Sequence, residues 1–132
     1  MNFSGPNIGQ KIMDMAKIQP DAVAVEWEGQ TYTRSDVLAA AANLGVFFQQ
    51  KDIKPTQTVA VISANPLRGI EAMIALWSQG SPTLFLDPRQ PLNDICASLK
   101  RAEIDMAFSD IKSLSRSELV HSLPDRNSCF AA

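Results

Sequence analysis

Two short apolar runs constrain the fold of this chain more than any other feature. They are TVAVIS, residues 58–63, and PTLFL, residues 82–86, and a segment with helical periodicity lies between them. The run TVAVIS is too apolar and β-branched for a half-exposed strand, so it is typical of a parallel sheet that is covered on both sides. A strand, a helix and a second strand form one β-α-β unit, which predicts the α/β class.

The segments after this unit extend the same pattern. Asn65 and Pro66 are typical of a helix start, and we expect that helix to end at Gly80. Its apolar face is expected to be Ile70, Met73, Ile74 and Trp77. A second helix, expected over residues 91–102, leads to a third short strand, DMAFSD, at residues 105–110. The expected core is therefore β-α-β-α-β in an open, mostly parallel sheet.

The residues before the sheet predict a helix and a β-hairpin. Apolar residues recur at helical spacing over residues 8–18, and AVAVEW, the turn residues Glu28 and Gly29, and QTYT then indicate two antiparallel strands. Thr33 and Asp36 resemble a capping box for a further helix, whose inward stripe is expected to be Val37, Ala41, Leu44 and Phe48.

We expect one domain, followed by a tail. Residues 1–110 carry all of the predicted sheet, whereas residues 111–132 lose their periodicity after one possible short helix from Ser115 to Leu123. We therefore predict a weakly ordered tail over residues 111–132.

Composition narrows the possible functions. The 132 residues are 45% apolar, which is enough for one hydrophobic core, and the net charge of -2 argues against a nucleic-acid-binding protein. Cys96, Cys129 and the single histidine, His121, form neither a disulfide framework nor a metal site. We find no signal peptide and no apolar run of the roughly 18 residues that span a bilayer, so we expect a cytoplasmic protein without a membrane span.

The tips of the apolar strands are the candidate binding positions, because ligands of open α/β sheets bind beyond the carboxyl ends of the strands. Asp87 in LFLDPRQP could accept a phosphate, but the preceding strand ends in ISAN, without the acidic residues that would hold Mg²⁺. We therefore interpret Asp87 as a turn residue. The helix start at Asn65 could bind an anion, but no glycine lies between Ile62 and Arg68, and a plain helix cap is the favoured interpretation.

The remaining candidates favour structural roles. His121 lies in the expected tail and has no evident nucleophile to activate. Trp77, Met73 and the pair Phe47 and Phe48 could line an apolar pocket, but their helical spacing favours the core. Arg68 and Arg89, near the strand tips, are expected to be solvated. We assign no catalytic, cofactor-binding or metal-binding residue in this chain.

Several short motifs also occur in an order that is characteristic of one enzyme family. They are P-D-x-x-A at Pro20, Asp21 and Ala24, T-Y at Thr31 and Tyr32, V-A-V at Val59 to Val61, an asparagine at Asn65, a helix-ending glycine at Gly80, and L-D-P-x-x-P at Leu86, Asp87, Pro88 and Pro91. Over residues 8–110 this order resembles the N-terminal subdomain of the adenylate-forming (AMP-binding) enzymes, which include acyl-CoA synthetases, nonribosomal-peptide adenylation domains and luciferases. Two departures from the family pattern are TQ at Thr56 and Gln57, and Phe85 before L-D-P.

The resemblance implies an ATP-dependent acid:thiol ligase, with fatty acids among the substrates of the family and with ATP, Mg²⁺ and coenzyme A as its cofactors. In the family, the phosphate-binding loop and the later motifs follow further along a longer chain, and this sequence has no glycine after Gly80 to form such a loop. We therefore expect a truncated or leading piece of such a ligase, which is inactive alone, binds no cofactor and forms a homodimer or larger species. The alternative is a standalone α/β binding or protein-interaction module; another metabolic α/β enzyme ranks third.

Overall fold

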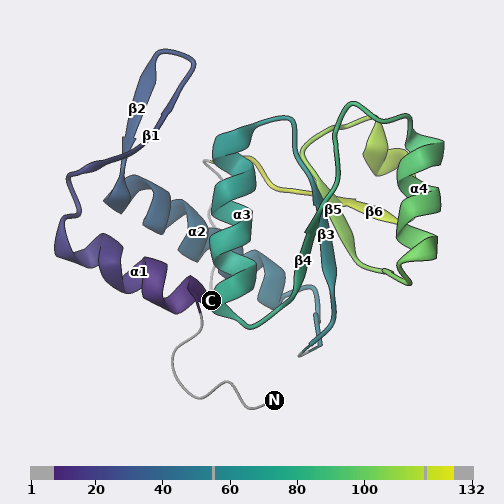
Figure 1. The fold of residues 1–132 in the computed structure, drawn as a ribbon, viewed down its shortest axis with the longest axis horizontal. Helices are drawn as coiled ribbons and strands as arrows, with labels where there is room; N and C mark the ends of the chain where they lie inside the picture. The colour runs from purple at the N-terminus through teal and green to yellow at the C-terminus, as the bar shows by residue number, and fades with distance from the viewer. Residues whose placement is uncertain (1–7, 55, 118, 127–132) are drawn as a thin grey trace.

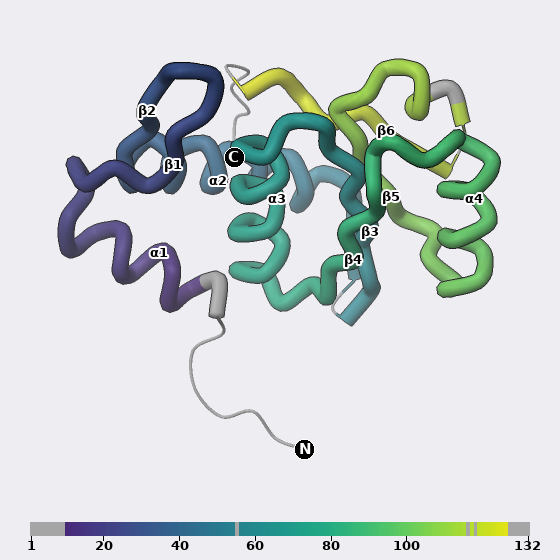
Figure 2. The backbone as a smooth tube through the Cα atoms, turned by 45° about the horizontal axis from the view of Figure 1, so that its top comes forward, coloured from purple at the N-terminus to yellow at the C-terminus, as the bar shows by residue number. Residues whose placement is uncertain are grey.

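The computed structural model describes residues 8–54, 56–117 and 119–126, and the structural statements below concern these residues. The fold has three layers (Figure 1). A parallel sheet lies between helices α2 (Arg34–Gln49) and α3 (Pro66–Ser78) on one face and helix α4 (Leu92–Arg101) on the other. Helix α1 (Ile8–Ile18) lies outside α3, farther from the sheet (Figure 2). This arrangement confirms the predicted α/β class.

The sheet contains four parallel strands in the order β4-β3-β5-β6. They are β3 (Val59–Ile62), β4 (Thr83–Phe85), β5 (Ala107–Ser109) and β6 (Val120–Ser122). All four residues of β3 are buried, as its apolar run predicts for a strand covered on both faces, and all three residues of β5 are buried as well. Strand β4 lies at the edge of the sheet, and its residues are half-buried or exposed.

Alternate residues of the central strands point to opposite faces of the sheet. Val59, Val61 and Phe108 point to the α2–α3 side, where the ring of Phe108 packs edge-on against Phe48 with the ring centroids 5.0 Å apart. On the opposite face, Ile95 and Leu99 of α4 are fully buried against the other residues of the same strands. Each face therefore has its own apolar cluster, which is the arrangement of a doubly wound sheet.

The hairpin consists of β1 (Val23–Trp27) and β2 (Gln30–Thr33), which pair antiparallel. Its two turn residues, Glu28 and Gly29, have φ values of 51° and 77°, as a type I′ turn requires. At the start of α2, the hydroxyl of Thr33 accepts from the Asp36 N–H, and the Asp36 carboxylate accepts from the Thr33 N–H. The hairpin and the capping box are thus confirmed.

The segment after Asp110 differs from the predicted helix over residues 115–123. It forms a 3-10 turn at Leu114–Arg116 and then strand β6, which pairs in parallel with β5. Val120 and Leu123 are buried against the sheet, and the Leu123 N–H donates to the Ser109 carbonyl at 2.8 Å. The predicted helix is wrong because a buried place at the edge of the sheet outweighs the weak local helix pattern.

Helix α3 buries a different set of residues from the predicted stripe of Ile70, Met73, Ile74 and Trp77. Ala72, Ala75 and Leu76 face the sheet, whereas Ile70, Met73 and Ile74 contact the α1 and hairpin side. Trp77 is half-buried and Ile74 is the one member of the predicted stripe that is buried. The helix lies between two packed layers, so a single amphipathic stripe does not describe it.

Candidate functional site

The carboxyl ends of β3 and β5 form a crevice at the point where the chain leaves the sheet in two directions. After β3 the chain enters α3 on one face, and after β5 it enters the turn at Leu114, which packs on the α4 face. Ligands of open α/β sheets bind at such switch points. The crevice, called here the carboxyl-edge crevice, has a volume of about 220 Å³ and is lined by Asn65, Arg68, Ser109, Asp110, Lys112, Ser115, Ser122, Leu123, Pro124, Asp125 and Arg126.

Asp110 closes the crevice between the two strand ends. Its carboxylate accepts from the Ser63 hydroxyl at 2.5 Å and from the Ala64 N–H at 3.0 Å. The Ser109 hydroxyl donates to the Ile62 carbonyl at 2.6 Å, which ties the same two strands together. Each Asp110 oxygen thus accepts one hydrogen bond, and the carboxylate holds the loop after β3 in place.

Asn65 caps α3, as expected from the sequence. Its side-chain oxygen accepts from the N–H groups of Leu67 and Arg68 at 3.0 and 3.4 Å. These are the donors that an anion at the helix N-terminus would use. The structure therefore supports the helix-cap interpretation over an anion site at this position.

Arg68 is buried, with 4% of its surface exposed, so the expectation that it is solvated is wrong. Its guanidinium lies 3.3 Å from the Glu71 carboxylate and donates to the Pro124 carbonyl at 2.8 Å. Burial lowers the pKa of Arg68, and the neighbouring Glu71 carboxylate partly opposes this shift. The Nε atom of Arg68 is buried without a hydrogen-bond partner among the described residues.

Arg126 completes a buried ionic cluster of Arg68, Glu71 and Arg126. Its Nε lies 2.9 Å from the fully buried carboxylate of Glu71, and its guanidinium lies over the Tyr32 ring, 4.9 Å from the centroid. Burial raises the pKa of Glu71, and the hydrogen bond and positive charge of Arg126 oppose that shift. The cluster fastens the segment after β6 to α3 and to the hairpin.

Asp87 forms the turn that the sequence predicts. Its carboxylate accepts from the Arg89 backbone N–H at 2.9 Å and from two nitrogens of the Arg89 guanidinium at 3.0 and 2.9 Å. These hydrogen bonds from Arg89 hold the pKa of Asp87 below its usual value. Arg89 is exposed, as expected, and its pKa is raised by the same hydrogen bonds and by the charge of Asp87.

The other residues considered from the sequence are dispersed. His121 lies on β6 beside the ring of Phe108, and Cys96 lies on α4, where its sulfur is 3.6 Å from the Ser117 hydroxyl. Cys129 lies outside the described residues. Phe47 and Phe48 belong to the core, as predicted, whereas Met73 borders an open groove. In the described ranges, no group of three or more histidine, cysteine, aspartate or glutamate side chains could hold a metal ion.

Sequence reasoning missed Glu71 and Arg126. Arg68 and Glu71 are three positions apart in a helix that is otherwise apolar, and this charged pair was the available signal. Arg126 gave no signal, because it is 55 residues from Glu71 in the chain.

Within the described part of the chain, no helix has the length and apolar character needed to cross a membrane.

Comparisons with known proteins relate this chain to a family of enzymes. The sequence profile of the AMP-binding enzymes matches residues 13–129. A dimodular nonribosomal peptide synthase of Bacillus subtilis is 27% identical over 109 residues, an alignment that covers 83% of this chain and 5% of that protein. The chain therefore spans a small part of this curated relative.

Solved structures share the fold. The N-terminal subdomain of Klebsiella oxytoca NpsA, in complex with anthranilyl-AMSN, superposes with a TM-score of 0.82 at 17% identity, covering 96% of this chain and 34% of that one. The o-succinylbenzoate CoA synthetase MenE of Bacillus subtilis, in complex with the acyl-adenylate intermediate OSB-AMP, superposes with a TM-score of 0.73 at 18% identity, covering 86% and 30%.

Proposed function

This chain belongs to the AMP-binding enzyme family, and from that premise we propose that it provides the leading α/β layer of an enzyme that forms acyl-adenylates. The complete enzyme would join a carboxylic acid to the α-phosphate of ATP with release of pyrophosphate, and would then pass the acyl group to a thiol with release of AMP. The observation that carries this proposal is the family match over residues 13–129. The likeness of the whole fold to an adenylate-forming subdomain supports it.

Within such an enzyme, we assign a scaffolding role to the residues of this chain. Asp110 and Asn65 use their side-chain oxygens to hold the loop and helix that follow β3. The Asn65 side chain accepts from the first N–H groups of α3, so this helix start does not present them to the phosphates of ATP. The groups that bind ATP and Mg²⁺ would accordingly come from residues outside this chain.

We propose an amino acid or an aryl acid as the substrate and a carrier-protein thiol as the acceptor. The nonribosomal peptide synthase relative and the anthranilyl-AMSN complex of NpsA support this choice. The likeness to MenE keeps a CoA thioester as the second candidate product. A fatty acid, included among the family's substrates, has no support in these relatives.

Reading the genomic sequence past the codon for Ala132 tests the proposal. An open frame that encodes a glycine-rich phosphate loop of the TSGTTG type within about one domain length is the expected result. A continuation without such a loop would favour a standalone α/β interaction module instead. The chain by itself is predicted not to bind Mg-ATP tightly, and saturable binding in the low micromolar range by calorimetry would contradict the scaffolding role.

We also propose that the isolated chain self-associates through the β4 edge of its sheet. Strand β4 has a neighbour on one side among the described strands, and Phe85 on it is 45% exposed. An uncovered strand edge that carries an apolar side chain favours pairing with another chain. In the complete enzyme, other parts of the protein would cover this edge.

A further inference from the structure

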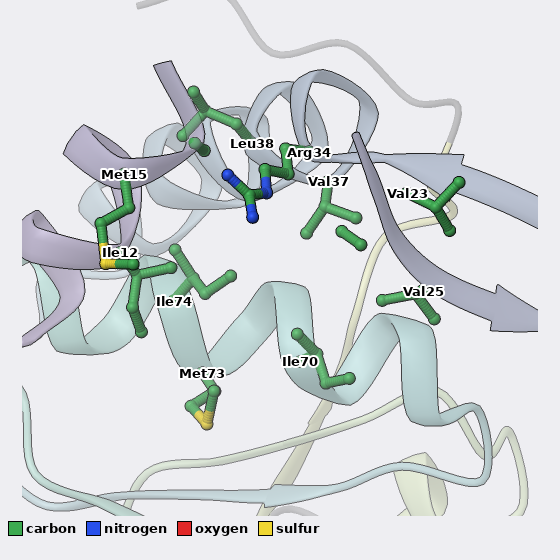
Figure 3. Close-up of a pocket in the computed structure, with 12 residues that line it drawn as sticks. Ile12, Met15, Val23, Val25, Arg34, Val37, Leu38, Ile70, Met73 and Ile74 are labelled. Atoms are coloured by element: carbon green, nitrogen blue, oxygen red, sulfur yellow. The ribbon is translucent and has the colours of Figure 1, made fainter. Parts of the chain in front are cut away.

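A groove on the side of α3 away from the sheet has the form of a small-molecule site. It lies between α1, β1, α2 and α3 and has a volume of about 420 Å³, within the range of ligand pockets. Figure 3 shows apolar side chains around it, among them Ile12, Met15, Val23, Leu38, Ile70 and Met73. The groove shares no lining residue with the carboxyl-edge crevice, so it is a separate site.

One lining residue is charged. Arg34, the first residue of α2, is half-buried, and its guanidinium lies among the side chains of Leu38, Val37 and Ile74 (Figure 3). No carboxylate or hydrogen-bond acceptor among the described residues contacts this guanidinium. Every other residue that lines the groove is apolar. The groove therefore combines an apolar wall with a single unpaired cation.

This pairing defines the complementary ligand. A guanidinium binds a carboxylate through two parallel hydrogen bonds, and these bonds are stronger where water is partly excluded. The apolar wall would cover a hydrocarbon body, and it includes Met15 and Val23, which are 60% and 56% exposed without a ligand. We propose that the groove binds a small amphiphile, a monocarboxylate with a linear apolar chain, whose carboxylate pairs with Arg34.

The volume and the charge favour a small molecule over a protein segment. A docked amphipathic helix would need a long apolar trough and would use charges along its rim. The groove instead has one cation and the volume of a ligand pocket.

Titration of the 132-residue chain with decanoate tests the proposal. Calorimetry would report the affinity, and methyl NMR of Ile12, Ile70 and Ile74 would report the location. The expected result is saturable binding below the concentration at which decanoate forms micelles, with shifts of those methyl groups and weaker binding of decanol. Arg34→Met should weaken decanoate binding at least about tenfold, because a charge-assisted pair is lost.

Two further variants test whether decanoate binds in the groove and not through nonspecific attraction to positive charge. Lys100→Met removes one positive charge from an exposed site on α4 and should leave decanoate binding unchanged. Ala24→Phe places a large side chain at an exposed position that lines the groove, and it should weaken decanoate and decanol alike. Circular dichroism of each variant checks that the fold is retained.

Three outcomes would overturn the proposal. The first is the absence of saturable decanoate binding. The second is an affinity that Arg34→Met leaves unchanged. The third is binding of an acidic amphipathic peptide that decanoate does not displace, because the groove would then be a site for a protein partner.

Discussion

Arg126 donates to the carboxylate of Glu71 at 2.9 Å, although 55 residues separate them in the chain. Glu71 is fully buried in α3 and also contacts Arg68, so it lies between two guanidinium groups. This contact holds the segment after β6 against the helix that follows β3. The ionic cluster therefore joins the last described residues to the centre of the fold.

Loss of the central carboxylate should destabilise the chain strongly. In Glu71→Ala, the buried Arg68 loses the carboxyl oxygen to which it donates, and leaving a buried charged donor without its partner costs about 3 kcal/mol or more. The free energy of unfolding in urea measures this cost. Glu26→Ala, which removes an exposed carboxylate from β1, is the matched control and should be close to neutral. Equal effects of the two variants would mean that the cluster contributes no stability.

The same carboxylate should give the stability a recognisable pH dependence. Burial raises the pKa of Glu71 in the folded state above its ordinary value of 4.5. Between the ordinary pKa and the raised pKa, the folded state therefore binds more protons than the unfolded state. The contribution of Glu71 to the free energy of unfolding should therefore fall as the pH rises through this window.

Subtraction isolates that contribution. The difference in unfolding free energy between the wild type and Glu71→Gln, followed from about pH 4.5 to neutral pH, should decrease as the pH rises. A difference that instead grows over the same range would show that Arg68 and Arg126 lower the pKa of Glu71 and outweigh its burial.

The stability of the Asp87 turn should depend on the side-chain acceptor oxygen of Asp87 and not on its negative charge. Asp87→Asn keeps an acceptor for the Arg89 N–H and should leave the melting temperature nearly unchanged, whereas Asp87→Ala removes the acceptor and should lower it. Thermal melts of the three proteins, followed by circular dichroism, compare these effects. If Asn is as damaging as Ala, the carboxylate itself matters, and a functional role for Asp87 becomes the better interpretation.

The exposed β4 edge should make the chain associate with itself. Light scattering over a concentration series should detect a dimer or larger species, and Phe85→Lys should shift the population towards monomer, because a charged edge resists pairing. Lys100→Met serves as a control on α4. A monodisperse monomer at high concentration, together with no binding of an apolar dye, would exclude this form of association.

Local patterns predicted most of the fold but not its ionic cluster. The apolar runs around Val61 and Leu84 predicted two parallel strands, because a helical segment between them makes a β-α-β unit. The pattern over residues 115–123 predicted a helix, but the structure places strand β6 there, since the place beside β5 is visible only in three dimensions. Arg126 could not be paired with Glu71 for the same reason.

In the candidate site, too, the contacts between near neighbours in the sequence were predicted and the long-range contacts were not. Asp87 and Asn65 were recognised as a turn residue and a helix cap, because such interactions span two or three residues. The contact of Asp110 with Ser63 joins residues that are 47 positions apart, so its role at the carboxyl-edge crevice emerged only from the structure.

Exchange of labelled pyrophosphate into ATP tests the central claim most directly, because the assay requires reversible acyl-adenylate formation. It should be run with a panel of amino, aryl and fatty acids, on the 132-residue chain and on the product translated through the downstream phosphate loop. We predict exchange by the longer product alone, with amino or aryl acids preferred. Exchange catalysed by the short chain, or none by the longer product with any acid, would contradict the account.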